Sequence, residues 1–417
     1  MRKIKLWPSV LTVLALIAFG IWQGMPLFNN QAQASTQIAA SDYNFNCSAS
    51  IDLRNFGTGA IISNIAQDGH GHLYAFIDND YTEMTINKYD MATCKLISSN
   101  PVQDLLFSVG LSNGLHWNKF RVSTNGQYAY VGNFGPGGTC YVARFTIGSN
   151  DPPACVLSST SKGSCTSLFG LGNGVGFALT DNDSQIMFGG YCQDASNDIT
   201  ILNRIDGSSN IVNGPSTTFN YVDDQNYSIV MGAGPGAIYI APNNPNLIYF
   251  ASCPITNWTD GQDASIDSFV CTYNRSTNKF TPIVMRSNAN LDYDMSMKNP
   301  VNMTADNNGN IYIGTDVQIN GGSSTCAIAK FASDGAWLGC IVPQFDGSGI
   351  GPNNSLTANY NSDSIVVSPD GRIICAVDNG GYGISDGDGN DKIKCWQAPA
   401  EPSTPPVVPG VPNTGRR

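Results

Sequence analysis

The sequence predicts an all-β fold: a six-bladed β-propeller with four-stranded antiparallel blades, its ring closed by an N-terminal strand. Three observations lead to this prediction. A turn followed by a short apolar strand recurs six times, at steps of 57, 56, 62, 65 and 62 residues. Only 2 of the 32 acidic residues are Glu, and the Asp and Asn that dominate favour turns over helices. The 417 residues, with 44 Gly and 22 Pro, suffice for one large β domain.

The six turns share one sequence context. Each lies between two apolar strands, and a third strand ending in a large apolar residue and then a fourth strand follow. Four antiparallel strands at a fixed period are the signature of a propeller blade, which cannot bury its faces alone and so packs in a ring. A β-sandwich with coincidental spacing is the alternative. The turns are Asp68-Gly69, Asn125-Gly126, Asp181-Asn182, Asn243-Asn244, Asn308-Gly309 and Asp370-Gly371.

The sixth blade lacks a fourth strand of its own. A Pro-rich stretch that cannot pair in a sheet follows residues 392–397. Residues 46–53 precede the first blade and have strand character, so we expect them to pair there and remove an exposed edge. The predicted parts are a signal peptide over 1–34, a linker over 35–45, the propeller over 46–397 and a Pro-rich tail over 398–417.

The N-terminus predicts export. A basic start, an apolar run and Ala32-Gln33-Ala34 before Ser35 are typical of a secretory signal, and an uncleaved run would be the chain's one contact with a membrane. The 12 Cys all lie beyond this signal and suit an oxidising compartment. A net charge of −11 argues against a nucleic-acid partner, because phosphate binding needs a basic face. We therefore expect a secreted protein, which could also be attached to the cell surface.

The blade pattern over residues 46–397 resembles the six-bladed propeller group that includes NHL-repeat and SMP-30-like proteins. SMP-30-like lactonases hold a divalent ion with a Glu among its ligands. The one Glu within the blades here, Glu83, lies in a loop between a second and a third strand, so the lactonase activity is not carried over.

The tail ends in a second resemblance. Val411-Pro-Asn-Thr-Gly415 is similar to a sortase sorting motif, with Val in place of Leu and no apolar segment before Arg416-Arg417. The preceding Pro-rich stretch is typical of an extended spacer. Together they indicate a bacterial cell-surface protein.

The cysteine spacing predicts disulfides within the blades. Some pairs flank a hairpin turn symmetrically, and facing positions on neighbouring strands meet disulfide geometry. A zinc site is not predicted, because the sequence has no CxxC and only 3 His. An alternative pairing, Cys47–Cys395, would close the ring covalently. The six expected pairs are Cys140–Cys155, Cys326–Cys340, Cys253–Cys271, Cys375–Cys395, Cys165–Cys192 and Cys47–Cys94.

Antiparallel strands place alternate connections at opposite ends of each blade. The first and third connections are short and define a short-turn face. The second connections and the links between blades are long and define a long-loop face. Long loops on a rigid scaffold commonly carry binding, and aromatic side chains there stack on sugars or pack on a protein. The predicted binding residues on the long-loop face are Trp117, Phe134, Trp258 and Tyr382.

One loop has the beginning of a calcium-binding pattern. Asp386, Asp388 and Asn390 are spaced like the first ligands of such a loop, and calcium is the one cofactor that the sequence suggests. Asp391 stands where Gly is usual, and no Glu follows at the twelfth position, so an Asp-rich turn is the alternative.

No catalytic signature rises above background, and the leading hypothesis is non-enzymatic. We expect adhesion or recognition, with a surface glycan or protein bound at the long-loop face. One alternative is an enzyme working at the central channel, such as a lactonase, a lyase or a glycan hydrolase. Another is a structural subunit of a surface layer or filament.

Overall fold

The computed structural model divides into two compact units, Met1–Ile38 and Ala39–Arg417, and every described strand lies in the second unit. The predicted signal peptide and the VPNTG pentapeptide lie outside the described residues. The described residues are 38–56, 60–78, 84–102, 119–132, 139–158, 168–169, 177–180, 183, 185–189, 191–192, 199–202, 211–213, 218–222, 228–230, 237–241, 244–251, 270–277, 279–284, 302–318, 325–345, 352–357, 365–378 and 390–400.

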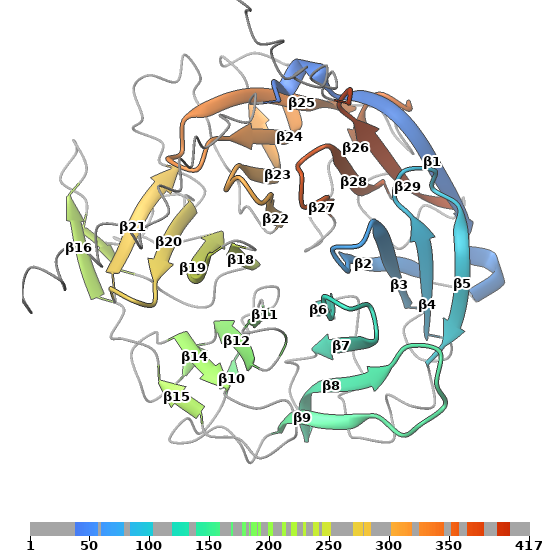
Figure 1. Ribbon diagram of the computed structural model, residues 1–417, viewed down its shortest axis with the longest axis horizontal. Coiled ribbons are helices and arrows are strands. Elements are labelled where there is room, and N and C mark those ends of the chain that lie inside the picture. The colour runs from blue at the N-terminus through green and yellow to red at the C-terminus, as the bar shows by residue number, and fades with distance from the viewer. Residues whose placement is uncertain are drawn as a thin grey trace, which may run out of the picture. The chain divides into compact units, whose positions relative to one another are not determined.

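The strands pair into antiparallel sheets of four, which confirms the predicted propeller (Figure 1). The first two blades are complete within the described residues. Blade 1 comprises β2 (Ile61–Gln67), β3 (His72–Asp78), β4 (Met84–Asp90) and β5 (Leu96–Pro101), and blade 2 comprises β6 (Lys119–Val122), β7 (Tyr128–Gly132), β8 (Cys140–Thr146) and β9 (Ala154–Ser158).

The next two blades follow the same order from the innermost to the outermost strand. Blade 3 comprises β11 (Phe177–Thr180), β12 (Gln185–Gly189), β14 (Ile199–Leu202) and β15 (Ile211–Asn213), and blade 4 comprises β18 (Ala237–Ala241), β19 (Asn244–Ala251), β20 (Val270–Asn274) and β21 (Lys279–Val284).

Blade 5 departs from the expected pattern by one added strand. Its four antiparallel strands are β22 (Asn302–Ala305), β23 (Ile311–Gln318), β24 (Thr325–Phe331) and β25 (Trp337–Phe345). The short strand β26 (Leu356–Thr357) pairs parallel to the outer edge of β25.

Two further pairs of short strands lie in segments that the sequence analysis assigned in part to long loops. These pairs are β10 (Leu168–Phe169) with β13 (Tyr191–Cys192) and β16 (Thr218–Val222) with β17 (Ser228–Val230). The long loops therefore carry some strand pairing of their own.

The last sheet joins the two ends of the propeller, as predicted. It comprises β27 (Ile365–Val367), β28 (Ile373–Asp378), β29 (Asn390–Gln397) and, as its outermost strand, β1 (Asn44–Asp52). β1 runs antiparallel to β29 from Asn44 opposite Gln397 to Asp52 opposite Asn390. The 3-10 helices η1 (Ala40–Asp42) and η2 (Leu53–Phe56) flank β1.

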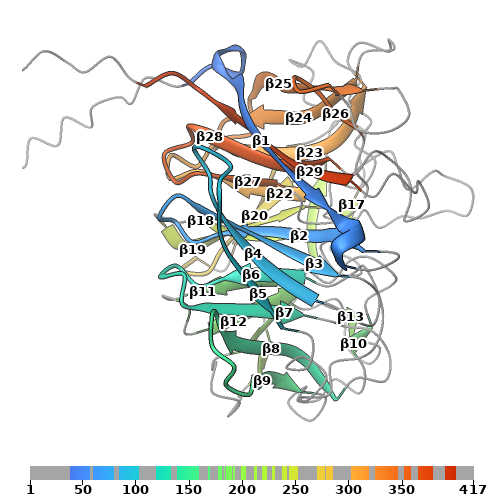
Figure 2. The ribbon, with the colours of Figure 1, turned by 90° about the vertical axis from the view of Figure 1, so that its right-hand side faces the viewer.

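The innermost strands contact one another in a closed cycle. Each touches the next, in the order β2, β6, β11, β18, β22, β27 and back to β2, so the six sheets surround one axis in Figure 1. Figure 2 shows the sheets from the side, with their strands running between two opposite ends. The turns β2–β3, β6–β7, β22–β23 and β27–β28 share one of these ends, which is the short-turn face.

The hydrophobic core lies in the seams between neighbouring sheets. Both faces of a strand such as β3 are buried. Leu73, Ala75 and Ile77 belong to the cluster shared with blade 6, whereas Tyr74 and Phe76 belong to the cluster shared with blade 2. A seam of this kind explains the long apolar runs in the second strands, because no side of such a strand faces water.

We predict that Ile51→Ala in β1 lowers the free energy of unfolding by about 2–4 kcal/mol, the usual cost of truncating a buried Ile. Ile51 is 4 % exposed and packs in the seam between blades 6 and 1. Leu96→Ala is the matched control, because Leu96 lies on β5, the outermost strand of blade 1, and is 54 % exposed. Denaturant unfolding measures both, and equal effects would show that β1 does not seal the ring.

Candidate functional site

Most residues assigned to binding from the sequence lie outside the described part of the chain. Asn390 is the exception: it begins β29 and pairs with Asp52. Strand ends nevertheless indicate the face to which these segments connect, because Gly132 ends β7, Asp378 ends β28 and Lys119 begins β6, all on the long-loop face. The predicted residues outside the described part are Trp117, Phe134, Trp258, Tyr382, Asp386 and Asp388.

The short-turn face is built from carboxylates that bond their own turns. Asp68 Oδ1 accepts from the backbone N of His70 at 2.8 Å, and Asp68 Oδ2 meets Nδ1 of His72 at 2.7 Å and accepts from the Tyr74 hydroxyl at 3.0 Å. Burial alone would raise the pKa of Asp68, but the hydrogen bonds from His70 and His72 outweigh it and lower that pKa. The carboxylate is therefore held ionised within the scaffold.

Blade 5 repeats this arrangement. Asp306 Oδ1 accepts from the backbone N of Asn308 at 2.9 Å and of Asn310 at 3.0 Å, while Oδ2 accepts from Asn310 Nδ2 at 2.8 Å and from the Tyr312 hydroxyl at 2.9 Å. In blade 2 a Ser takes the place of the Asp, and Ser123 Oγ accepts from the backbone N of Tyr128 at 2.8 Å. The turn that repeats in the sequence is thus a hydrogen-bonded cap on the hairpins of blades 1, 2 and 5.

These caps also contact the next blade. A Cβ built on Gly126 of blade 2 would lie 2.8 Å from both Asp68 Oδ2 and the Tyr74 hydroxyl of blade 1. Gly371 of blade 6 stands in the same relation to Asp306 and Tyr312 of blade 5. We call this arrangement, an Asp–Tyr pair covered by the turn glycine of the following blade, the inter-blade clasp.

In blades 1, 2 and 5, a basic residue on the third strand lies opposite a tyrosine on the second strand. Tyr74 lies opposite Lys88, Tyr130 opposite Arg144 and Tyr312 opposite Lys330, each on neighbouring second and third strands. Lys88 Nζ is 5.3 Å from the centre of the Tyr74 ring, and Lys330 Nζ is 5.2 Å from that of Tyr312, both within cation–π range. The sequence analysis missed this pairing, although the basic residue before the large apolar end of the third strand recurs with the period.

Lys330 and the N-terminal segment form a buried cluster between blades 5 and 6. The Lys330 side chain has no exposed surface, and its Nζ donates to the Tyr43 hydroxyl at 3.2 Å. That hydroxyl also lies 3.1 Å from the Tyr312 hydroxyl and donates to the carbonyl of Gly371. Burial lowers the pKa of Lys330 to about 8, although the Asp306 carboxylate partly opposes the shift. Tyr43 lies within residues 35–45, which the sequence analysis assigned to a linker.

A second buried lysine, Lys394, contacts the connection that precedes β26. Lys394 Nζ is 2.5 Å from Asp378 Oδ2, and neither side chain has exposed surface. The same Nζ donates at 2.9 Å to the carbonyls of Pro352 and Ser355, which precede β26. Burial lowers the pKa of Lys394, and the hydrogen bond and charge of Asp378 oppose that shift. The ion pair thus attaches this connection to the end of blade 6.

Disulfides reinforce individual blades and the ring. Four expected pairs are confirmed, and the described part of the chain contains no free cysteine. The pairs Cys165–Cys192 and Cys253–Cys271 stay predictions: residues 165 and 253 are not described, while β13 contains Cys192 and β20 contains Cys271. The confirmed pairs are Cys47–Cys94, Cys140–Cys155, Cys326–Cys340 and Cys375–Cys395.

We predict that the stability of the wild type rises relative to Lys330→Met between pH 7.5 and 9.5. In the folded protein the pKa of Lys330 is about 8, which lies below its pKa in the unfolded chain. Between pH 7.5 and 9.5 the unfolded chain therefore binds more protons than the folded protein, so the free energy of unfolding increases as the pH rises. Each pH unit contributes up to about 1.4 kcal/mol, so the gain is on the order of 2 kcal/mol. Urea unfolding at both pH values tests this, and a constant difference between the proteins would contradict it.

We also predict that Asp378→Asn lowers the free energy of unfolding by about 3–5 kcal/mol, because it leaves the Lys394 charge buried without its carboxylate. The double variant Asp378→Leu/Lys394→Met is the control. It should be more stable than the single variant, since apolar replacement of both partners removes the cost of burying the charges. A double variant that is no more stable than Asp378→Asn would contradict the assignment.

No family model matches the sequence, and no curated protein matches it. Among solved structures, the chain is similar to a gluconolactonase from Xanthomonas campestris, at 12 % identity over 88 % of this chain and 93 % of that one, with a TM-score of 0.46. It is similar to a putative TolB from Agrobacterium tumefaciens, at 11 % identity over 85 % and 98 % of the two chains, with a TM-score of 0.41. It spans 44 % of a GH74 enzyme from Niastella koreensis, at 14 % identity over 76 % of this chain, with a TM-score of 0.40.

Proposed function

We propose that this protein is a secreted or surface-attached binding propeller that recognises a surface glycan or a protein through its long-loop face. The observation that carries the proposal is the different use of polar groups at the two ends of the blades. On the short-turn face, the carboxylates of Asp68 and Asp306 are bonded within their turns and covered by the next blade. That face is committed to holding the ring together.

The proposal assigns recognition to the opposite face because the connections between strands there are long and contain aromatic residues. Between β19 and β20 the chain runs from Ala251 to Val270, and between β28 and β29 from Asp378 to Asn390. These intervals contain Trp258 and Tyr382. By contrast, only residues 242 and 243 separate β18, which ends at Ala241, from β19, which begins at Asn244, on the short-turn face. Long segments anchored at both ends by rigid strands are the usual carriers of binding residues.

The disulfides and the N-terminal sequence support the proposed compartment. Four disulfides in the described residues favour an oxidising environment. No described helix has the length and apolar character needed to span a bilayer. The disulfides, the basic and apolar N-terminus and the Pro-rich tail support export and display at a cell surface.

The test compares binding by the wild type and Trp258→Ala to an immobilised glycan array and to whole bacterial cells. Truncating an aromatic anchor costs about 2 kcal/mol, which corresponds to a roughly 30-fold weaker Kd. His70→Ala is the matched control, because His70 is exposed on the short-turn face. Binding that survives combined replacement of Trp117, Trp258 and Tyr382, or that is lost with His70→Ala, would contradict the proposal. Release of cleaved sugars in the same assay would favour the enzymatic alternative.

A further inference from the structure

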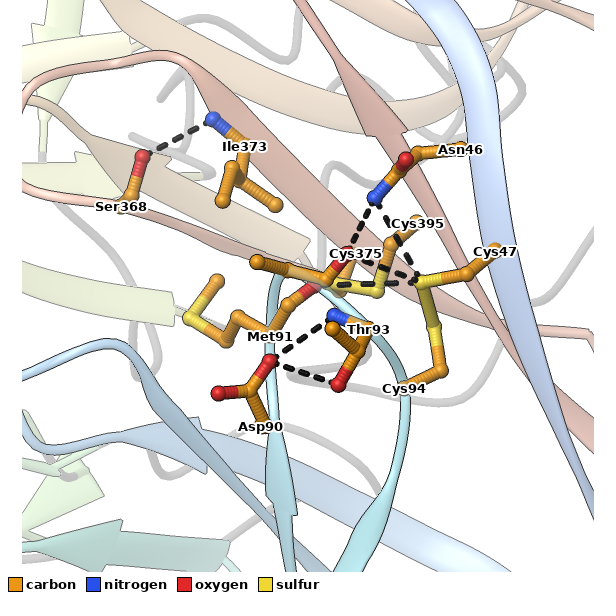
Figure 3. Close-up of a disulfide and its surroundings, with 11 residues drawn as sticks. Asn46, Cys47, Asp90, Met91, Thr93, Cys94, Ser368, Ile373, Cys375 and Cys395 are labelled. Atoms are coloured by element: carbon orange, nitrogen blue, oxygen red, sulfur yellow. Dashed lines mark hydrogen bonds between the residues drawn. A yellow bond between two sulfur atoms is a disulfide. The ribbon is translucent and has the colours of Figure 1, made fainter.

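Four cysteines from three strands and a turn meet at the seam between blades 6 and 1. Cys47 in β1 lies directly opposite Cys395 in β29, and Cys395 lies directly opposite Cys375 in β28. Residues directly opposite one another on neighbouring strands project to the same face of a sheet, so these three form a row. Cys94, from the turn between β4 and β5 of blade 1, approaches Cys47 from the neighbouring blade (Figure 3).

Cys395 is the central cysteine of this row. It lies between Cys47 and Cys375 and forms a disulfide with Cys375. The disulfides are Cys47–Cys94 and Cys375–Cys395, with Cα atoms 5.8 Å and 4.1 Å apart. The sulfur atoms of Cys47, Cys94 and Cys395 all lie within 4.8 Å of one another. The two disulfides are therefore in near contact, and Cys395 requires no strand movement to face Cys47.

Burial and hydrogen bonding distinguish the sulfur atoms. Cys375 and Cys395 are 0 % and 1 % exposed, Cys94 is 8 % exposed and Cys47 is partly exposed, so the Cys47–Cys94 bond is more open to an external thiol than the Cys375–Cys395 bond. The Asn46 side chain donates through Nδ2 to Cys47 Sγ at 3.6 Å and to the carbonyl of Ala92 at 2.6 Å (Figure 3). A donor at this sulfur stabilises a thiolate, which makes Cys47 the better leaving group of its pair.

We propose that the two disulfides form a redox-sensitive latch that exchanges partners. A dithiol reductant attacks Cys94 Sγ as a thiolate; its sulfur bonds to Cys94, the Cys47–Cys94 bond breaks, and the electron pair leaves on Cys47. The Cys47 thiolate then attacks Cys395 Sγ, the Cys47–Cys395 bond forms, and Cys375 leaves as a thiolate that takes up a proton. The second thiol of the reductant releases Cys94 and completes its own disulfide, so one dithiol is oxidised and one protein disulfide is reduced.

The exchange changes which strands the disulfide of Cys47 joins. In the present structure the bond from Cys47 joins β1 to blade 1, across the seam between the last and first blades. After exchange it joins β1 to β29 within blade 6. The seam then depends on its hydrophobic cluster and on hydrogen bonds such as that from the backbone N of Ile62 to Asp391 Oδ2, at 2.9 Å. Reduction would thus loosen the first blade while keeping the closing strand in place.

The test is limited reduction of the folded full-length protein with dithiothreitol, followed by acid quenching, alkylation and peptide mapping by mass spectrometry. The expected result is a Cys47–Cys395 cross-linked peptide as the main new product, with Cys94 and Cys375 alkylated. Three results would overturn the proposal: an intact Cys375–Cys395 peptide with Cys47 and Cys94 both alkylated, a Cys94–Cys395 cross-link, or alkylation of all four cysteines without any new cross-link.

A pair of variants tests the same step without a reductant. Cys94→Ser leaves Cys47 as a thiol beside Cys395, and we expect the purified variant to carry Cys47–Cys395 with Cys375 alkylated after unfolding. Cys140→Ser is the matched control, since it frees Cys155 on a hairpin of blade 2. In that control Cys155 should be alkylated and Cys375–Cys395 should persist. Alkylated Cys47 in the Cys94→Ser variant would contradict the exchange.

Discussion

The structure depends on buried carboxylates that must find hydrogen-bond donors where one blade meets the next. An unpaired buried carboxylate is costly, so Asp68 and Asp306 are stable in their seams because turn amides and a tyrosine hydroxyl satisfy each of them. Covering each Asp–Tyr pair requires a residue without a Cβ, and the turn glycine of the following blade supplies it. Each inter-blade clasp therefore couples the turn of one blade to the turn of its neighbour, alongside the apolar packing of the seams.

The two ends of the blades are stabilised by different contacts. On the short-turn face, the turn carboxylates and tyrosine hydroxyls that recur in blades 1 and 5 hold neighbouring blades together. The N-terminal Tyr43 joins the same network through Lys330 and Tyr312. One connection, the segment that contains Pro352 and Ser355, is attached to blade 6 by Lys394, which also pairs with Asp378. A ring of this kind needs closure, which the β1–β29 pairing supplies and the Cys47–Cys94 disulfide reinforces across the last seam.

The sequence predicted the blade pattern, the closing strand and four disulfides, because these follow from the six recurring turns, the missing fourth strand of the last blade and the positions of the cysteines. It did not predict the clasps. Asp68 and Gly126 belong to different repeats, and no spacing rule relates a carboxylate to the glycine of the next turn until the sheets are packed. The partners of Lys394 could not be predicted from the sequence either. Asp378 lies on the neighbouring strand of the sheet, and the carbonyls of Pro352 and Ser355 come from another segment. The predicted aromatic site lies outside the described residues, so it rests on sequence and topology.

The most direct test of the clasp compares Gly126→Ala with Gly69→Ala by equilibrium unfolding. Both glycines have positive φ, +67° and +75°, so both substitutions carry the backbone cost of about 1–2 kcal/mol. A Cβ at Gly69 would meet nothing within 4 Å, whereas a Cβ at Gly126 would press on Asp68 and Tyr74. The clasp predicts that Gly126→Ala destabilises the protein by about 1–3 kcal/mol more than Gly69→Ala, the usual cost of overpacking. Equal losses for the two variants would contradict it.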